Sequence, residues 1–370
     1  MRVLFQGAGA IGVAGAALFG DRHEASVASR TPSPRPRAAF PRRVGNLDSS
    51  PSRAPSADAG RDDPVRNDVV RDFVGWRVSD VAATRRVTII DWADAREAGT
   101  TRRTGGPQRR RRDRPWDLIV LTTRPGDLDQ DVVDAIAECA PVFLAITSQV
   151  ADDLRLARSM FPGIEVLIFG PAFLSERVDA SEVPVVGRQV RYWAPAGLPR
   201  FLIAGRSHAV TRLSRSLGAL VLPVPVAMVT MPPAVFIPYA GELSARSGRW
   251  TALRLHLRRP TKAAAEAVHA LTGVRLPMSA SLAGLILDAM ERVVPFDVGA
   301  YAGRHFGRHE GQTLDMLEAW IARETERSPS GETQRSPGRV AAPTDERLPA
   351  AALRDLAQAL RPRVTSKPMP

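Results

Sequence analysis

Three glycines near the start of the chain follow a short apolar run with the spacing Gly7-x-Gly9-x-x-Gly12. Residues 3–5 are typical of a buried parallel strand, and residues 13–19 continue as an alanine-rich helix. In such a unit the glycines allow a sharp turn, close approach of backbone amides to a pyrophosphate, and tight helix packing. The anion lies at the helix N-terminus. The alternative is that the glycines only close a tight turn. We predict a dinucleotide-binding loop formed by Gly7, Ala8, Gly9, Ala10, Ile11 and Gly12.

The second strand of this unit is expected at residues 25–30, which end in Ser29 and Arg30. An acidic residue at this position would bind a free ribose 2′-hydroxyl, whereas a hydroxyl and a guanidinium suit a 2′-phosphate. The residues therefore favour NADP over NAD as the cofactor. The alternative is that Arg30 is one more solvated arginine.

The composition is that of a globular protein, with 370 residues of which 44% are hydrophobic, and this length predicts two domains. A net charge of +12 raises nucleic acid as a partner. Only Lys262 and Lys367 are lysines, however, so the charge reflects an arginine bias along the whole chain. An electrostatic nucleic-acid binder has no physical reason to avoid lysine, and we therefore do not expect nucleic acid as the partner.

The single cysteine, Cys139, excludes an internal disulfide and a cysteine-rich metal site, and its apolar neighbours predict a core position. We expect no membrane span, no secretion signal and a cytoplasmic location. We also expect no bound metal. His305-x-x-x-His309 has the spacing of a helical metal pair, but the sequence offers no evident third ligand.

Strands and helices alternate in the first half of the chain, which predicts a parallel sheet with right-handed crossovers, an α/β fold of the Rossmann type. The loops at the carboxyl ends of its strands converge on one crevice. An insertion of low complexity, residues 31–115, interrupts the pattern; it contains one strand at 86–91 and an arginine run at 109–112. Beyond the insertion, strands are expected at 117–122, 142–147 and 166–169, and helices at 128–139 and 151–160.

From about residue 206 the apolar spacing becomes helical. Helices are expected at 209–217, 234–247, 262–271, 280–293, 313–327 and, after a loose linker, 349–360. The predicted division is a dinucleotide-binding domain at 1–205, an all-helical domain for substrate binding or dimerisation at 206–327, and a flexible linker with a short helix at 328–370. We expect a homodimer formed through the helical domain, because long helices rich in alanine and leucine often pair.

The glycine loop, the strand and loop from Asp117 to Arg124, the segment 305–317 and the helical second half together resemble the ketopantoate reductase family. The resemblance covers residues 1–30 and 116–325. It implies that NADPH reduces a 2-keto group between a Rossmann domain and a helical domain. It also implies that the glycines bind phosphate and that Arg30 binds the 2′-phosphate.

The same resemblance places further residues near the cofactor. It assigns Thr122, Thr123 and Arg124 to the loop after the fourth strand, where the family has a lysine in place of Arg124. Ser148 occupies the place of an asparagine in a loop that has lost its glycines. The replacement of the lysine by Arg124 keeps the positive charge but changes its geometry.

Larger departures lie in the helical half. The family's catalytic lysine would fall within residues 228–249, which contain no lysine, and Lys262 lies too far along to replace it. Of the family's late Thr-Glu-Ile-Asp pattern only Asp315 is kept. Without a proton donor the barrier to hydride addition rises by several kcal/mol. The candidates left for catalysis are Tyr239, Glu242, His305 and Asp315.

The sequence is therefore compatible with three functions. The first is an NADP-dependent oxidoreductase that acts on a small 2-keto or 2-hydroxy acid. Arginines near the crevice would bind the carboxylate of this substrate. The second is an NADP-binding protein of the same fold that has lost catalysis. The third is a nucleic-acid-binding protein that uses the arginine-rich insertion.

Overall fold

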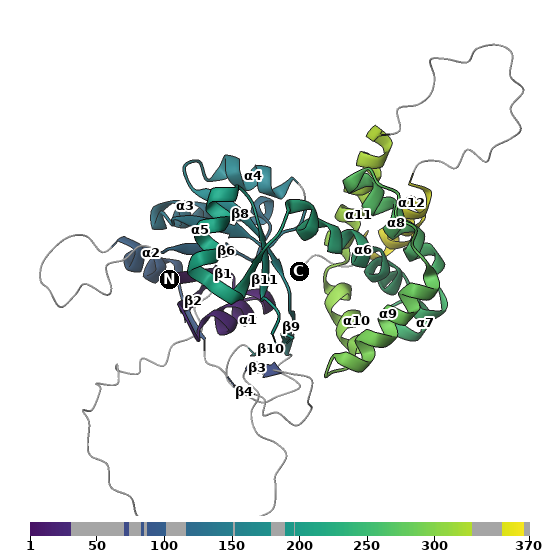
Figure 1. Ribbon diagram of the computed structural model, residues 1–370, viewed down its shortest axis with the longest axis horizontal. Helices are drawn as coiled ribbons and strands as arrows, with labels where there is room; N and C mark the ends of the chain where they lie inside the picture. Colours follow the sequence, from purple (N-terminus) through teal and green to yellow (C-terminus); the bar gives the residue numbers. More distant parts are fainter. Residues whose placement is uncertain are drawn as a thin grey trace, which may run out of the picture.

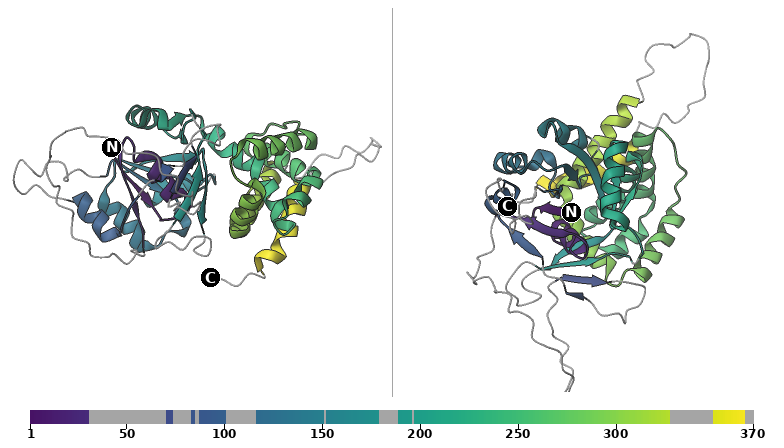
Figure 2. Two further views of the ribbon diagram at one scale, coloured as in Figure 1. Left: turned by 90° about the horizontal axis from the view of Figure 1, so that it is seen from below. Right: turned by 60° about the vertical axis from the view of Figure 1, so that its left-hand side comes forward.

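A computed structural model describes residues 1–30, 70–73, 83–84, 87–100, 116–150, 152–178, 189–195, 197–327 and 350–365. Within these residues the chain forms a sheet with its flanking helices and a separate group of helices, which lie side by side in Figures 1 and 2. Residue runs 109–112 and 328–349, which the sequence predicts to be an arginine loop and a linker, lie outside the described residues.

The main sheet has the order β12-β11-β8-β7-β6-β1-β2-β5 among the described residues, and all its pairs are parallel except β11 with β8. Its central strands are buried runs of apolar residues, as expected for a sheet covered on both faces. The strands are β1 (Arg2–Gln6), β2 (Glu24–Ala28), β5 (Thr88–Ile90), β6 (Leu118–Leu121), β7 (Phe143–Ile146), β8 (Glu165–Pro171), β11 (Phe201–Ala204) and β12 (Val221–Pro223).

Helices cover both faces of this sheet because its side chains alternate between two cores. Phe5 and Phe201 pack with Phe19 on one face, whereas Leu4 and Trp116 belong to the core of the other face. Cys139 is buried in that second core, as predicted. The flanking helices are α1 (Ala10–Phe19), α2 (Trp92–Thr100), α3 (Gln130–Cys139), α4 (Asp153–Met160) and α5 (Ser207–Leu217), with the short 3-10 helices η1 (Pro125–Asp127) and η2 (Gly218–Leu220).

A second, smaller sheet has the order β4-β3-β10-β9 among the described residues. Its strands are β3 (Val70–Phe73), β4 (Ala83–Thr84), β9 (Leu174–Val178) and β10 (Gln189–Trp193). Strands β9 and β10 pack against α1. Within the insertion expected at 31–115 the structure describes β3, β4, β5 and α2, and β5, which lies in the strand expected at 86–91, pairs with β2 at the edge of the main sheet.

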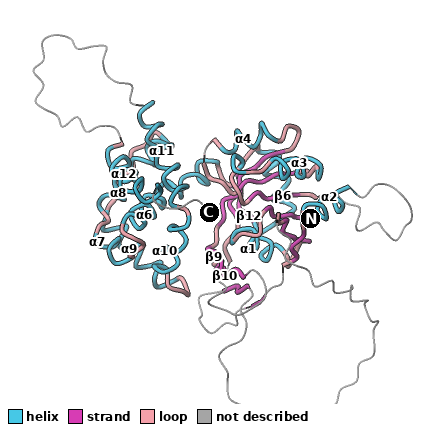
Figure 3. The backbone as a smooth tube through the Cα atoms, turned by 180° about the vertical axis from the view of Figure 1, so that it is seen from behind, coloured by secondary structure: helices cyan, strands magenta, loops and turns pink. Residues whose placement is uncertain are grey.

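The helical group surrounds α6 (Val226–Ala245), which packs against α8, α11 and α12 (Figure 3). The expected separate C-terminal helix is instead part of this core, since Leu353, Leu356 and Leu360 of α12 are fully buried in it. The remaining helices are α7 (Trp250–Leu255), α8 (Arg258–Thr272), α9 (Ala280–Val293), α10 (Val298–Arg308), α11 (Glu310–Arg327) and α12 (Ala351–Thr365). The sheet continues to β12, beyond the boundary after residue 205 that the sequence predicts.

One helix departs from the expectation that the chain lacks a membrane-length segment. By length and composition α6 is apolar enough to cross a membrane, with a mean hydropathy of 1.2 over its best window. Half of that window is buried by neighbouring helices, and α6 carries the buried carboxylate of Glu242. The structure uses α6 as the core helix of the helical group.

Candidate dinucleotide site

The turn between β1 and α1 has a backbone that requires glycine at two positions. Gly7 has φ +92°, a backbone conformation that residues other than glycine rarely adopt. Its N–H donates to the carbonyl of Ala28 at the end of β2 (2.8 Å). A Cβ atom at Gly12 would lie 2.1 Å from the carbonyl oxygen of Gly7. The first turn of α1 therefore packs directly on the loop, as the spacing predicts.

Gly9 differs from these two glycines because a Cβ atom there would have no neighbour within 4 Å. It is the N-cap residue of α1, and no side chain caps the helix at this point. The first N–H groups of α1, around Ala10 and Ile11, thus lie beside open space at the positive end of the helix dipole. This is the geometry that binds a phosphate, and the residues present fit a dinucleotide.

Gln6 joins the ends of the two central strands, a contact that sequence reasoning missed. Its side-chain oxygen accepts from the N–H groups of Thr122 (3.2 Å) and Thr123 (3.1 Å), and the hydroxyl of Thr122 donates to the Gln6 carbonyl (2.6 Å). The hydroxyl of Thr122 would also lie 3.0 Å from a Cβ at Gly7. Thr122 and Thr123 therefore lie beside the glycine loop, where the sequence predicts them.

Arg124 links the sheet to the helical group through two carboxylates. Its guanidinium donates to Asp153 at the start of α4 (3.0 Å and 3.4 Å) and to Asp315 on α11 (3.3 Å). Asp153 is buried and also accepts the hydroxyl of Ser148, whereas Asp315 is exposed. The hydrogen bond with Asp153 raises the pKa of Arg124 above its ordinary value. Ser148 therefore forms a hydrogen bond with Asp153, a buried carboxylate that sequence reasoning missed.

Strand β9 brings a second cation to the glycine loop. The guanidinium of Arg177 donates to the carbonyl of Ala8 (2.9 Å), across 169 positions of sequence. The two preceding residues of β9 contact α10, where Arg304 donates to Glu176 (2.9 Å) and the hydroxyl of Tyr301 donates to the carbonyl of Ser175 (3.3 Å). Strand β9 therefore connects the loop to the helical group. A mixed polar strand of five residues gave no sequence signal for this.

At the end of β2 the two residues expected to bind a 2′-phosphate differ in their surroundings. Ser29 is buried, and its N–H donates to the carbonyl of Ile90 (2.9 Å). Arg30 is exposed and pairs with Asp129, which precedes α3. An ion pair between exposed side chains contributes about 0–1 kcal/mol, so the pair of Arg30 and Asp129 adds little to the stability of the fold.

Two of the candidate catalytic residues are engaged inside the helical group. Glu242 has no exposed surface and accepts from Arg246 (2.7 Å) and Arg259 (2.6 Å). Tyr239 donates its hydroxyl to Thr261 (2.8 Å), which in turn donates to the carbonyl of Leu257 (2.6 Å). Burial raises the pKa of Tyr239. These side chains hold α6 against α8, and Lys262 is exposed on α8.

His305 lies on α10, one turn after Tyr301, and its ring stacks on the Tyr301 ring with centroids 5.4 Å apart. Burial lowers the pKa of His305 to about 4, with the neighbouring His309 and Arg308 adding to the effect. The imidazole is therefore neutral at pH 7. Within the described residues, no group of three or more His, Cys, Asp or Glu side chains is placed to hold a metal ion.

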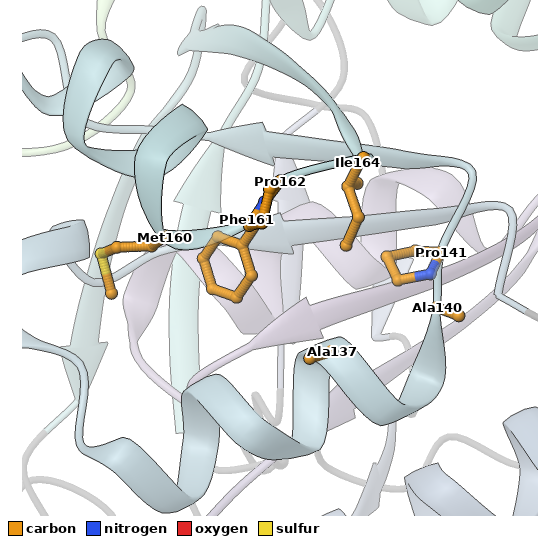
Figure 4. A pocket seen from close by; sticks show the side chains of 8 residues that line it. Ala137, Ala140, Pro141, Met160, Phe161, Pro162 and Ile164 are labelled. Atoms are coloured by element: carbon orange, nitrogen blue, oxygen red, sulfur yellow. The ribbon is translucent and has the colours of Figure 1, made fainter.

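The two hollows described lie away from the glycine loop. The larger, about 390 Å³, lies between the α3–β7 and α4–β8 connections and is lined by apolar side chains such as Met160, Phe161 and Pro141 (Figure 4). These connections precede the parallel strands, whereas the glycine loop follows one. The smaller, about 230 Å³, lies where α4 and β8 meet α6 and α8. Neither contains a candidate site residue predicted from the sequence.

No protein-family model matches the chain, and none of the curated proteins matches it. Solved structures do match over nearly their whole length. A 2-dehydropantoate 2-reductase of Geobacter metallireducens covers 98% of this chain with 100% of its own, at 12% identity and TM-score 0.56. A dimeric ketopantoate reductase of Staphylococcus aureus covers 98% with 98% of its own, at 10% identity and TM-score 0.52.

A protein of Bacillus subtilis described as a probable 2-dehydropantoate 2-reductase covers 98% of this chain with 99% of its own, at 10% identity and TM-score 0.51. At sequence identities this low, the structural matches show the fold alone. They confirm the predicted fold class, a Rossmann-type sheet domain followed by helices, and the predicted resemblance at the level of fold. The chain has the fold of the 2-dehydropantoate 2-reductases, with which it shares 10–12% of its sequence in these comparisons.

Proposed function

We propose that this chain is an NADP-dependent oxidoreductase that reduces a small 2-keto acid or a related carbonyl compound. The observation that carries the proposal is the loop between β1 and α1, where Gly12 is sterically required and Gly9 leaves open space at an uncapped helix N-terminus. When bound, the dinucleotide supplies a hydride to the carbonyl carbon. The protein's residues bind and orient both molecules.

The cofactor's charged groups have partners of opposite charge in this proposal. The amides of the first turn of α1 bind the pyrophosphate, and Arg177 adds a positive charge at the same loop. Arg30 releases the exposed Asp129 to bind the 2′-phosphate, and this distinguishes NADP from NAD.

Arg124 is the residue proposed to hold the substrate carboxylate. Asp153 fixes one side of its guanidinium, so the side chain has one orientation whether or not a ligand is present. The other side contacts the exposed Asp315, which a substrate carboxylate replaces at small energetic cost because surface ion pairs contribute about 0–1 kcal/mol. A pre-oriented arginine fork suits a carboxylate.

A second candidate, dinucleotide binding without catalysis, has its own support. Tyr239 and Glu242, two of the side chains considered as proton donors, are tied to Thr261 and to two arginines. Both functions place a dinucleotide at the same loop, and they differ only in turnover.

Titration of NADPH against the purified protein, followed by cofactor fluorescence, tests the shared part. We expect saturable binding, and Arg30→Ala is expected to weaken NADPH about tenfold while leaving NADH unchanged. Arg22→Ala is the matched control, because Arg22 is exposed at the opposite end of β2. Wild-type protein that binds neither dinucleotide would overturn both candidates. Turnover of a panel of 2-keto acids then separates them, since binding without turnover favours the second.

A further inference from the structure

Gln6 is a buried polar residue at the centre of the main sheet. It ends β1, which lies between β2 and β6, and it is 6% exposed. The three residues before it, Val3, Leu4 and Phe5, are apolar and fully buried, as expected for a central parallel strand. A polar side chain at such a position requires hydrogen-bond partners, so the partners of Gln6 indicate what it does.

The orientation of the Gln6 amide follows from its partners. Gln6 pairs with Leu121, the last residue of β6, so its side chain reaches the two residues that follow that strand. Its oxygen accepts from the backbone N–H groups of Thr122 (3.2 Å) and Thr123 (3.1 Å). Because a backbone N–H can only donate, the amide oxygen must face these groups. The amide nitrogen therefore faces the hydroxyl of Thr123 and donates to it (3.2 Å).

This arrangement gives the two neighbouring threonine hydroxyls different roles. Thr123 accepts from the amide of Gln6, so its own proton must point away from Gln6, and within the described residues no acceptor for that proton is found. Thr122 differs, because its hydroxyl donates to the backbone carbonyl of Gln6 (2.6 Å). One hydroxyl is thus a free donor, whereas the proton of the other is used within the fold.

The free donor lies beside the glycine loop. The Thr123 hydroxyl oxygen lies 3.9 Å from the position that a Cβ at Gly7 would take, and Thr123 is only half-buried. The other donors of this loop are the first N–H groups of α1, beside the open space at Gly9. Donors that gather at one loop suit an oxygen-rich ligand, such as the pyrophosphate and ribose of a dinucleotide.

We propose that Gln6 is a positioning residue that directs the Thr123 hydroxyl to donate to an oxygen of the bound dinucleotide. The ligand is the dinucleotide of the proposed function, on which this role of Gln6 rests. The family resemblance places Thr122 and Thr123 alike near the cofactor, whereas the hydrogen bonds assign the contact to Thr123 alone. Gln6 acts through Thr123 and does not itself contact the ligand.

Valine substitutions of the two threonines test the assignment, because valine replaces the hydroxyl by a methyl group of similar size. Titration of NADPH and NADH, followed by cofactor fluorescence, measures the dissociation constants. Thr123→Val is expected to raise both about tenfold, the effect of one lost hydrogen bond to a charged ligand. Thr122→Val is the matched control. It is expected to change both constants less than about twofold and to lower the urea midpoint, because it removes the donor to the Gln6 carbonyl. Thr123→Ser keeps the hydroxyl and is expected to keep the affinity.

Gln6→Glu tests the positioning role. A glutamate keeps the oxygen that accepts from the N–H groups of Thr122 and Thr123, but its carboxylate cannot donate to the Thr123 hydroxyl. The hydroxyl then donates to the glutamate and presents its lone pairs, instead of its proton, to the ligand. Together with the added negative charge, this is expected to raise both dissociation constants roughly 30-fold. In a Thr123→Val background only the charge acts, so the same substitution is expected to raise them about threefold.

The outcomes distinguish this role of Gln6 from the proposed function. Normal binding by Thr123→Val, equal losses of affinity in the two valine variants, or an equal effect of Gln6→Glu in both backgrounds would overturn the role of Gln6 while the dinucleotide site stands. A wild type that binds neither dinucleotide would overturn that role together with the proposed function. Unchanged urea unfolding of Thr123→Val establishes that the variant is folded.

Discussion

The glycine loop and the helical group differ in how their polar groups are used. At the loop, backbone N–H groups lie at an uncapped helix N-terminus beside open space, with Thr122 and Arg177 close by. In the helical group, Glu242 and Tyr239 are already paired, and His305 is kept neutral by burial. Backbone N–H groups at a helix N-terminus beside open space can bind a ligand, whereas paired buried groups stabilise the fold. Binding is therefore better supported by this structure than any particular catalytic residue.

The largest expected effect separates two glycines of the same loop. Gly12→Ala places a methyl group 2.1 Å from the Gly7 carbonyl, and we expect it to lower the free energy of unfolding by on the order of 4 kcal/mol. Gly9→Ala places its methyl group in open space, so the protein is expected to stay within about 1 kcal/mol of the wild type while losing dinucleotide affinity. Urea unfolding and NADPH titration measure the two effects.

A loop whose only role is a tight turn would give a different result. In that case Gly9→Ala would leave every binding property unchanged. Loss of NADPH affinity in Gly9→Ala together with normal unfolding would instead show that the dinucleotide occupies the space beside Gly9.

Removal of the Glu242 charge is expected to have the next largest effect. Glu242→Gln leaves Arg246 and Arg259 without their buried carboxylate, and because both arginines are partly exposed we expect a loss of about 3 kcal/mol, the lower end for a broken buried ion pair. Urea unfolding checks this. Glu318→Gln is the control, because Glu318 and its partner Arg361 are both exposed, and its effect is expected to stay below about 1 kcal/mol. Normal stability combined with lost turnover would instead make Glu242 catalytic.

The pH dependence of stability tests whether His305 is a buried neutral side chain. Its folded pKa of about 4 lies below the ordinary 6.5, so between these values the unfolded chain binds a proton that the folded chain does not. Stability is therefore lost as the pH falls from about 6.5 to 4, by at most about 3 kcal/mol. His305→Phe keeps a ring against Tyr301 and is expected to reduce this loss in thermal melts. Equal pH profiles for the two proteins would contradict the assignment.

The sequence predicted the sheet and the loop well because their determinants are local. Apolar runs mark the buried parallel strands, and the helix expected at 280–293 has the bounds of α9. Helix α10 was missed because Gly299 and Gly303 lower its helical propensity. They are needed there for packing, since a Cβ at Gly299 would lie 2.9 Å from Trp250 and one at Gly303 would lie 3.0 Å from the Gly248 carbonyl.

The contacts that complete the candidate site were beyond sequence reasoning because they join distant positions. Arg177 reaches Ala8 from strand β9, whose pairing partner β10 gives a weak local signal in the sequence. Arg124 was predicted near the cofactor, but its bonds to Asp153 and Asp315 depend on how the helical group lies against the sheet. Spacing in the sequence identifies a loop, whereas tertiary packing determines which charges surround it.

Arg177 offers a smaller and more specific test of the loop. Arg177→Gln keeps a donor that can bond the Ala8 carbonyl but removes the positive charge. If that charge faces the pyrophosphate, the dissociation constants of NADPH and NADH are both expected to rise about tenfold. Arg191→Gln is the control, since Arg191 lies on the neighbouring strand β10 and pairs with Glu176 instead of the loop. A loss confined to NADPH would place Arg177 at the 2′-phosphate instead.

The smallest expected effect concerns the exposed half of the Arg124 contact. Asp315→Asn removes an ion pair at the surface, and we expect less than about 1 kcal/mol of lost stability. Because Asp315 competes with a substrate carboxylate for Arg124, the same change is expected to lower KM for a 2-keto acid while kcat stays constant. Asp153→Asn removes the buried partner that orients Arg124, and it is expected to raise KM. If both substitutions raised KM equally, Asp315 would be part of the binding site and not a competitor for it.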